Sequence, residues 1–264
     1  MDLAQENAPA GARNVRLVVA YNGTRYHGWQ RQAEGVSTVQ QCIEAAAGRV
    51  LGHPVSVAGA GRTDAGVHAL GQVANLRTTN LSIPLANFRR ALNSKLPDDI
   101  AALSSAQAGE DFHASRSAIG KTYRYRIHLG PAKPVMFADQ VWHCRAALDL
   151  ERMGAAARRV VGRHDFRGFA YAAESRENTV RTVTRCEVAE CGDEVRIFVT
   201  GDGFLYKMVR NIVGTLVEIA RGRWGPEQID VIVSTRDRGY AGPTALPGGL
   251  CLMSVDYPPA AAGG

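Results

Sequence analysis

A short segment dense in glycine, Gly59 to Gly66, constrains the fold of this 264-residue chain more than any other. It follows the apolar stretch Val55 to Ala58, which is typical of a β-strand. Its three glycines permit positive φ angles and the close approach of another molecule to the backbone, so a tight turn is expected where the strand ends. This turn presents Arg62 and Asp64, a cation and a carboxylate, from a loop.

Two common glycine-rich loops do not fit this segment. A P-loop requires Lys followed by Ser or Thr, and neither pair follows Gly66. A dinucleotide-binding turn requires Gly or Ala where this chain has Asp64, whose charge would lie against a pyrophosphate. An aspartate in such a loop most often hydrogen-bonds its own backbone. The other reading is a carboxylate used for chemistry, with Arg62 available to bind a phosphate or a base edge.

Composition is that of an ordinary globular protein: 45% of the residues are hydrophobic, and no apolar run reaches the length of a membrane span. The first 14 residues lack the features of a signal peptide, so we expect a cytoplasmic protein that does not bind membranes. The five cysteines include no Cys-x-x-Cys pair and the seven histidines show no ligand spacing. We therefore expect reduced thiols and no metal.

The net charge is modest, +6, but the arginines gather in groups. Such groups are usually solvated surface, although guanidinium groups also match phosphate oxygens and bind nucleic acids in a salt-dependent way. Charge alone leaves both readings open. The densest groups are Arg89/Arg90, Arg124/Arg126, Arg158/Arg159/Arg163/Arg167 and Arg221/Arg223.

Helical and strand patterns alternate along the chain and predict an α+β fold in two halves of similar layout, residues 15–110 and 111–257, between flexible tails at 1–14 and 258–264. Each half is expected to be a ferredoxin-like unit, and the two to share one sheet with a central cleft. Strands are predicted at about 15–21, 55–58, 69–76, 100–106, 121–129, 182–190, 194–200 and 250–256, and helices at about 39–51, 84–94, 150–161 and 204–221 and after Pro226.

The segment Gly61–Ala69, Gly-Arg-Thr-Asp-Ala-Gly-Val-His-Ala, resembles the signature of the tRNA pseudouridine synthase A family. These enzymes isomerise uridine in the anticodon arm of tRNA without a cofactor. The resemblance extends in one collinear order over roughly residues 15 to 257, which a chance match to a short motif would not do. The further matching segments are 18–32, 121–125, 164–166, 181–183, 203–211 and 249–250.

The resemblance implies pseudouridine formation at tRNA positions 38, 39 and 40, with a mixed, mainly antiparallel sheet, helices on one face and an RNA-binding cleft. It makes Asp64 the nucleophile, akin to a glycosidase carboxylate facing an oxocarbenium-like centre. Arg62 would enter the helix stack and hold the target nucleotide out of it. Tyr123 would stack on the flipped uracil. The resemblance also implies a homodimer, no cofactor and no metal.

The helix predicted over Phe204–Arg221 carries a polar stripe that includes Lys207, Arg210 and Gly214. A solvated face is the ordinary reading, yet glycine there costs about 1 kcal/mol relative to alanine unless something packs closely. The resemblance pairs Arg210 with Asp64, which would hold the carboxylate ionised and oriented. Together with Arg62 and Tyr123, two lysines are expected to contact substrate, Lys121 and Lys207.

His68 is expected to be structural, because a histidine on a strand is more often packed than catalytic, and Asp165 to cap or hydrogen-bond a loop. Residues 167–171 and Cys251 depart from the family pattern, and this departure concerns loop contacts and substrate detail rather than the reaction. A noncatalytic RNA-binding protein is the alternative, although it would have no need for Asp64 near phosphates. Affinity for ATP or a dinucleotide would favour a nucleotide-binding enzyme instead.

Overall fold

The computed structural model describes residues 11–33 and 35–259 of the chain. Within these ranges the chain forms five α-helices and ten strands, and the strands belong to one mixed, mostly antiparallel sheet that is not closed. The α+β class predicted from the sequence is therefore confirmed. The ferredoxin-like character of each half stays a prediction.

The described residues fall into two compact units, of which the first is drawn from Met1–Ile119 and Leu252–Gly264. Its β1 pairs antiparallel with both β3 and β4, and the short β2 pairs antiparallel with β3. The elements of this unit are β1 (Arg13–Tyr21), α1 (Val39–Leu51), β2 (Val57–Gly59), β3 (His68–Thr78), α2 (Leu85–Asn93), β4 (Ile100–Gln107) and most of β10 (Leu250–Asp256).

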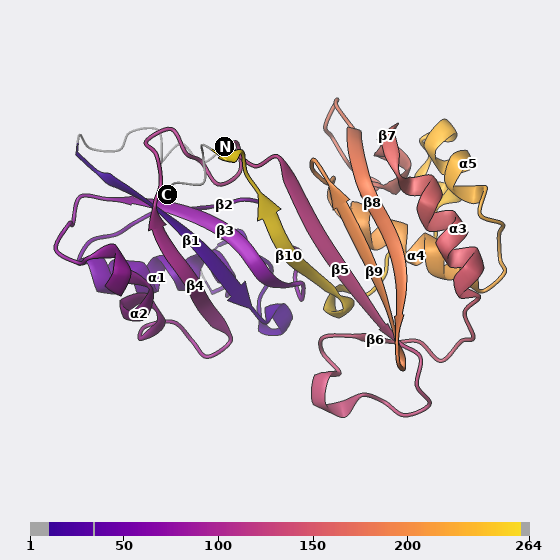
Figure 1. Cartoon of the computed structure of the whole chain (residues 1–264), viewed down its shortest axis with the longest axis horizontal. Helices are drawn as coiled ribbons and strands as arrows, with labels where there is room; N and C mark the ends of the chain where they lie inside the picture. The colour runs from indigo at the N-terminus through magenta and orange to yellow at the C-terminus, as the bar shows by residue number, and fades with distance from the viewer. Residues whose placement is uncertain (1–10, 34, 260–264) are drawn as a thin grey trace. The chain divides into compact units, whose positions relative to one another are not determined.

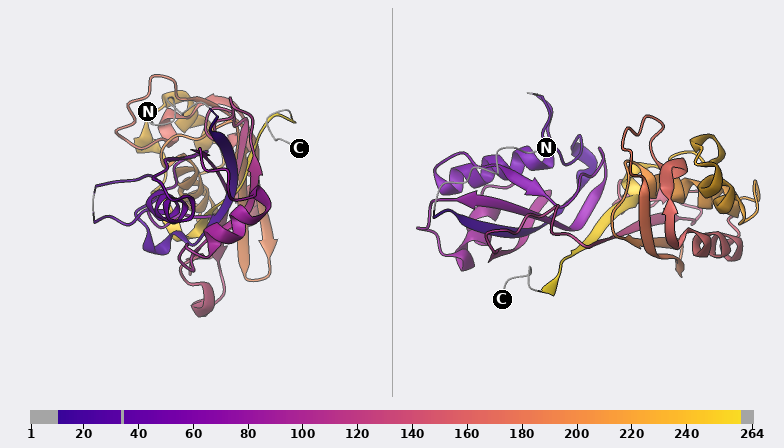
Figure 2. Two further views of the ribbon diagram at one scale, coloured as in Figure 1. Left: turned by 90° about the vertical axis from the view of Figure 1, so that its left-hand side faces the viewer. Right: turned by 90° about the horizontal axis from the view of Figure 1, so that it is seen from above.

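Local sequence explains the first strand and helix of this unit. Along β1, Val15, Leu17 and Val19 are fully buried, as alternation on a half-buried strand requires. Helix α1 begins after Thr38, whose side chain accepts a hydrogen bond from the backbone of the first turn, and ends at Gly52 in the left-handed conformation with φ 76°. Helix α1 lies across one face of the strands of this unit (Figure 2).

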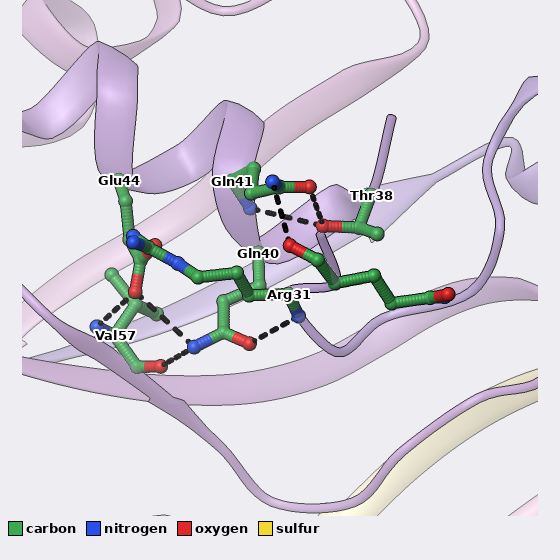
Figure 3. A network of polar contacts seen from close by, with 7 residues as sticks. Arg31, Thr38, Gln40, Gln41, Glu44 and Val57 are labelled. Atoms are coloured by element: carbon green, nitrogen blue, oxygen red, sulfur yellow. Dashed lines mark hydrogen bonds and ion pairs between the residues drawn. The ribbon is translucent and has the colours of Figure 1, made fainter. Parts of the chain in front are cut away.

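A buried polar cluster ties β2 to α1 (Figure 3). The Glu44 side chain is 5% exposed and forms an ion pair with Arg31. One of its carboxylate oxygens accepts hydrogen bonds from the Val57 backbone N–H at 3.0 Å and from Gln40 Nε2 at 3.2 Å. Gln40 Nε2 also donates to the Val57 carbonyl oxygen at 2.9 Å. Both backbone polar groups of Val57 are thus held by side chains of α1, just before the chain enters the Gly59–Gly66 segment.

The second unit spans Gly120–Cys251. Its β9 pairs antiparallel with β5 and β8, β7 pairs antiparallel with β8, and β6 is parallel to β5. Helix α3 packs against β8 and against the other two helices of the unit (Figure 1). The elements are β5 (Gly120–His128), β6 (Trp142–His143), α3 (Leu150–Val160), β7 (Gly162–Asp165), β8 (Val180–Cys191), β9 (Glu194–Gly201), α4 (Met208–Ala220) and α5 (Gln228–Thr235).

The helix predicted over Phe204–Arg221 was wrong at its start, because α4 begins only at Met208. The residue before it, Lys207, adopts the left-handed conformation with φ 61°, which a continuous right-handed helix excludes. The polar stripe is also not a solvated face. Two further residues of this stripe, Asn211 and Glu218, are buried. Asn211 donates to two backbone carbonyls, and Glu218 pairs with two arginines that follow the helix.

Across the described residues the strand order is β4-β1-β3-β10-β5-β9-β8-β7, with β2 attached to β3 and β6 to β5. The far end of the chain completes the first unit. Ile119 N–H donates to the Asp256 carbonyl oxygen at 2.9 Å, and the Tyr257 hydroxyl donates to the Ala114 carbonyl oxygen at 2.6 Å. The Tyr257 ring packs on Phe112 with ring centroids 5.1 Å apart.

Candidate active site

The loop that carries Asp64 joins β2 to β3 in the first unit. It leaves the sheet directly after β2, where Ala60 N–H donates to the Val73 carbonyl oxygen at 2.8 Å. Val67 N–H donates to the Asp64 carbonyl oxygen at 3.1 Å and closes a tight turn, in which Gly66 has φ 77°. The glycine-hinged turn predicted from the sequence is therefore present.

Thr63 anchors this loop from the inside. It is buried, whereas Arg62 before it is exposed and Asp64 after it is half-buried. The Tyr21 hydroxyl lies 2.9 Å from the Thr63 hydroxyl, and Trp29 N–H donates to the Thr63 carbonyl oxygen at 3.0 Å. The two charged side chains consequently stand on a backbone that is fixed between them.

The loop also packs so closely on neighbouring backbone that a side chain has no room. Gly28 has φ 91°, and a β-carbon there would lie 2.6 Å from the Thr63 carbonyl oxygen and 3.2 Å from the carbonyl carbon of Asp64. A β-carbon at Gly59 would meet the indole ring of Trp29. Glycine is therefore required at both positions for the loop to keep its place.

The far side of the turn is held in the same way. Gly66 N–H donates to the Tyr26 carbonyl oxygen at 3.3 Å, and the Tyr26 hydroxyl donates to Asp99 at 2.5 Å. Burial and this hydrogen bond raise the pKa of the Tyr26 phenol well above its usual value, so it remains a donor. His68 is buried and its Nδ1 accepts a hydrogen bond from Gly23 N–H at 3.1 Å, which agrees with the structural role expected for it.

In the second unit, Tyr123 lies on β5 opposite Val199 of β9 and is 7% exposed. Tyr123, Tyr125 and Ile127 are all buried, so this is the core face of the strand. The Tyr123 ring meets the ring of Phe204 edge to face, with centroids 5.3 Å apart and an interplanar angle of 88°. This contact links β5 to the segment that precedes α4.

Arg210 lies in the first turns of α4 and is fastened to a loop of the same unit. Its Nε donates to the Ala245 carbonyl oxygen at 2.8 Å, and Ala245 N–H donates to the Arg210 carbonyl oxygen at 3.1 Å. One turn further along, a β-carbon at Gly214 would overlap the carbonyl oxygen of Pro243. The close packing that the sequence required at Gly214 is thus confirmed.

The two lysines expected to contact substrate are both in the second unit. Lys121 lies on β5, and its burial, followed by the nearby charges of Arg181 and Arg176, lowers the pKa of its ammonium group below the usual value. Lys207 lies over the rings of two exposed tyrosines.

Asp165 accepts hydrogen bonds from a loop, as expected. It also ends a strand, β7, that was not predicted.

The predicted site residues divide between the units. Arg62 and Asp64 share one loop of the first unit. The other four belong to the second unit, so the pairing of Arg210 with Asp64 remains a prediction. The sequence did not lead us to predict Thr63 or Gly28 as supports of the loop. Its signal at Gly28 is a glycine between two residues with ring side chains, His27 and Trp29. The second-unit residues are Lys121, Tyr123, Lys207 and Arg210.

Comparison with known proteins identifies the family. Residues 17–115 and 156–258 match the family model described as tRNA pseudouridine synthase. The chain belongs to this family. It is 43% identical over 245 residues to "tRNA pseudouridine synthase A 2" of Clostridium perfringens (strain 13 / Type A), covering 93% of this chain and 100% of the relative. For "tRNA pseudouridine synthase A" of Syntrophotalea carbinolica the identity is 45%, with 93% and 96% covered, and for that of Geobacter sulfurreducens 44%, with 93% and 100%.

Membership of the family makes this chain an isomerase that acts on uridine in tRNA. The first matched range contains the whole Asp64 loop with its supports, and the second contains Lys207 and Arg210. Among the residues that the structure describes, no helix is long and apolar enough to cross a membrane. In the same part of the chain, no group of three or more His, Cys, Asp or Glu side chains could hold a metal ion.

Proposed function

We propose that this enzyme converts uridine to pseudouridine at positions 38, 39 and 40 in the anticodon stem and loop of tRNA, in the cytoplasm. The resemblance of Gly61–Ala69 to the family signature suggests the substrate. The observation that carries the proposal is that Asp64 stands on a backbone held by Tyr21, Gly28 and Trp29. A group that must meet one carbon of a sugar has to be positioned within a fraction of an ångström.

In this proposal Asp64 is the nucleophile. The bond between uracil N1 and ribose C1′ breaks while the carboxylate attacks the sugar or stabilises the cation that develops there. The uracil turns and C5 bonds to C1′, which breaks any bond that the carboxylate has formed to C1′ and regenerates Asp64. The proton on C5 leaves and N1 gains a proton, so that no oxidant or reductant is needed. Arg62 extends from the same loop and holds the nucleotide out of the stack, because a base in a stem must be extruded for this chemistry.

The second unit supplies the other roles. Tyr123 stacks on the extruded uracil. Arg210 pairs with Asp64 and keeps the carboxylate ionised, using N–H groups other than the Nε that binds the Ala245 carbonyl. Lys121 and Lys207 contact the substrate. Two copies of the chain form a homodimer, so light scattering should give twice the mass of one chain.

The test is tritium release from tRNA that carries [5-³H]uridine, in a buffer free of metals and cofactors. The parent protein should release tritium, and Asp64→Asn, which keeps the size of the side chain but removes its charge, should release none. Anticodon-arm RNAs labelled at a single position should each react at 38, 39 and 40. Binding of tRNA without release by the parent would favour the noncatalytic alternative, and equal release by both proteins would remove Asp64 as nucleophile.

A second comparison tests the proposed pairing. Arg210→Ala should abolish turnover while leaving tRNA affinity nearly unchanged, since its partner is Asp64 rather than RNA. Arg210→Lys is the matched control: it keeps the positive charge and should retain part of the activity, although it cannot reproduce the planar fork of the guanidinium. Unchanged turnover in Arg210→Ala would exclude this ion pair from the mechanism.

A further inference from the structure

Two exposed tyrosines and a lysine gather on the second unit, and we call Tyr171, Tyr206 and Lys207 the tyrosine–lysine platform. The tyrosines are 42% and 46% exposed, and their rings meet edge to face with centroids 5.2 Å apart. Lys207 Nζ lies 4.5 Å from the centroid of the Tyr171 ring and 5.2 Å from that of Tyr206. Tyr171 N–H donates to the Tyr206 carbonyl oxygen at 3.0 Å, which joins the two segments that build the platform.

Lys207 is held in place rather than extended into solvent. Its φ of 61° is one of two positive values among the described residues that are not glycine. The backbone conformation and the two rings together fix a positive charge beside two exposed aromatic faces. Large exposed aromatic side chains next to a positioned cation are typical of surfaces that bind unpaired nucleotides, where bases stack and phosphates need a counter-charge.

Further cations border the same two segments. Arg176 lies in the segment that Tyr171 begins, and a β-carbon at Gly203, in the segment before Lys207, would lie 3.6 Å from Arg181 Nε. Arg181 and Arg176 are also close enough to Lys121 for their positive charges to contribute, after burial, to the lowered pKa of its ammonium group. Arg176 Nε lies 3.6 Å from a carboxylate oxygen of Glu174, whose side chain is only 8% exposed. Arg176 and Lys207 are thus the cations of these two segments closest to the platform in sequence, and two exposed carboxylates, Glu177 and Asp202, lie in the same segments.

We propose that the platform is a second RNA contact of the enzyme, on which an unpaired base of the tRNA stacks against Tyr206 while Lys207 and Arg176 bind the flanking phosphates. This inference rests on the proposed function only in that the ligand is tRNA. It adds Tyr171, Tyr206 and Arg176 to the residues that recognise substrate. Stacking on Tyr206 is independent of base identity, so the contact contributes affinity and orientation rather than sequence preference.

The experiment measures the affinity of the full chain carrying Asp64→Ala for a fluorescent tRNA transcript by anisotropy at several salt concentrations. Tyr206→Ala should weaken binding by about 5-fold to 150-fold, the range for loss of one stacked base, without changing the salt dependence. Tyr206→Phe keeps the ring and should bind normally. The matched control is Tyr240→Ala, because Tyr240 is 47% exposed on the same unit but outside the platform.

Arg176→Ala should lower the slope of log affinity against log salt by about 0.7 to 0.9, the amount for one phosphate contact. The proposal would be overturned if Tyr206→Ala and Tyr240→Ala bound the tRNA with equal affinity. If truncation of Tyr206 impairs folding, photocrosslinking of the Asp64→Ala protein to tRNA carrying 4-thiouridine decides instead. A tRNA adduct on the peptide containing Tyr171 or Tyr206 supports the platform, and crosslinks confined to other peptides refute it.

Tritium release by the parent protein separates this inference from the proposed function. Release together with equal binding by Tyr206→Ala and Tyr240→Ala would reject the platform and leave the enzyme activity in place. Absence of release, with binding that still depends on Tyr206, would reject the proposed reaction but support the platform as an RNA-binding surface.

Discussion

Replacing Gly28 with alanine should disturb the Asp64 loop from a residue that carries no functional group. Two costs arise at this position. The first is the left-handed backbone, φ 91°, which disfavours any residue with a β-carbon. The second is contact, because the new β-carbon would lie 2.6 Å from the Thr63 carbonyl oxygen, and that atom belongs to the backbone and cannot rotate away.

The two costs can be separated by a matched variant. Gly52 has φ 76° and nothing within 4 Å of an added β-carbon, so Gly52→Ala carries the backbone cost alone, about 1 kcal/mol of unfolding free energy. Restoring an ordinary contact at Gly28 requires a shift of roughly 0.8 Å, and overpacking of this kind costs about 1–3 kcal/mol more. If Asp64 is the proposed nucleophile, a displacement of this size in its loop should reduce kcat about 100-fold.

Urea unfolding and tritium release from labelled tRNA measure the two effects on the same preparations. Gly28→Ala should lose more stability than Gly52→Ala, and only Gly28→Ala should lose turnover. If both variants lose the same unfolding free energy, the Asp64 loop accommodates the added β-carbon at Gly28 without an energetic cost. Normal turnover in Gly28→Ala would refute the idea that close backbone packing positions Asp64.

Two further predictions concern buried carboxylates, one in each unit. Glu44→Ala leaves the Val57 N–H buried without its acceptor and should lower the unfolding free energy by about 1–3 kcal/mol in urea titrations; an unchanged urea midpoint would contradict this role for Glu44. In the second unit, the hydrogen bond from Arg126 lowers the pKa of Glu194 below its ordinary 4.5, so the stability it contributes is fully present above pH 4.5 and is lost as pH falls through the folded-state pKa. Glu194→Gln should remove this part of the pH dependence in melting curves recorded between about pH 3 and 6; an unchanged profile would contradict the assignment.

The features that sequence predicted are those with local causes. The helix predicted at about 39–51 from Thr38 and the apolar spacing is α1, whose first turn Thr38 caps and which Gly52 ends. The turn that presents Asp64 followed from its glycines in the same way. The start of α4 was wrong by four residues, since the apolar periodicity continues through the preceding segment and the left-handed conformation of Lys207 is unusual for any residue but glycine.

The features that sequence did not predict depend on partners far along the chain. Strand β7 is four residues long, three of them charged or polar, and exists because β8 pairs with it. The support of the Asp64 loop comes from Tyr21 and Gly28, more than 30 positions earlier, and only the fold brings them to Thr63. The platform likewise joins Tyr171 to Tyr206 through one backbone hydrogen bond.

The position of β10 in the sequence has a consequence for biosynthesis. The first unit takes its closing residues from Leu252 onward, although the rest of it ends at Ile119. During synthesis the ribosome adds about 137 further residues after Ile119, which takes roughly 7 to 27 seconds, before Asp256 can accept the Ile119 N–H. The continuous second unit has all its residues before that strand arrives. The half that bears Asp64 is therefore the last to be completed, and a ribosome stalled before residue 252 would leave it without its final strand.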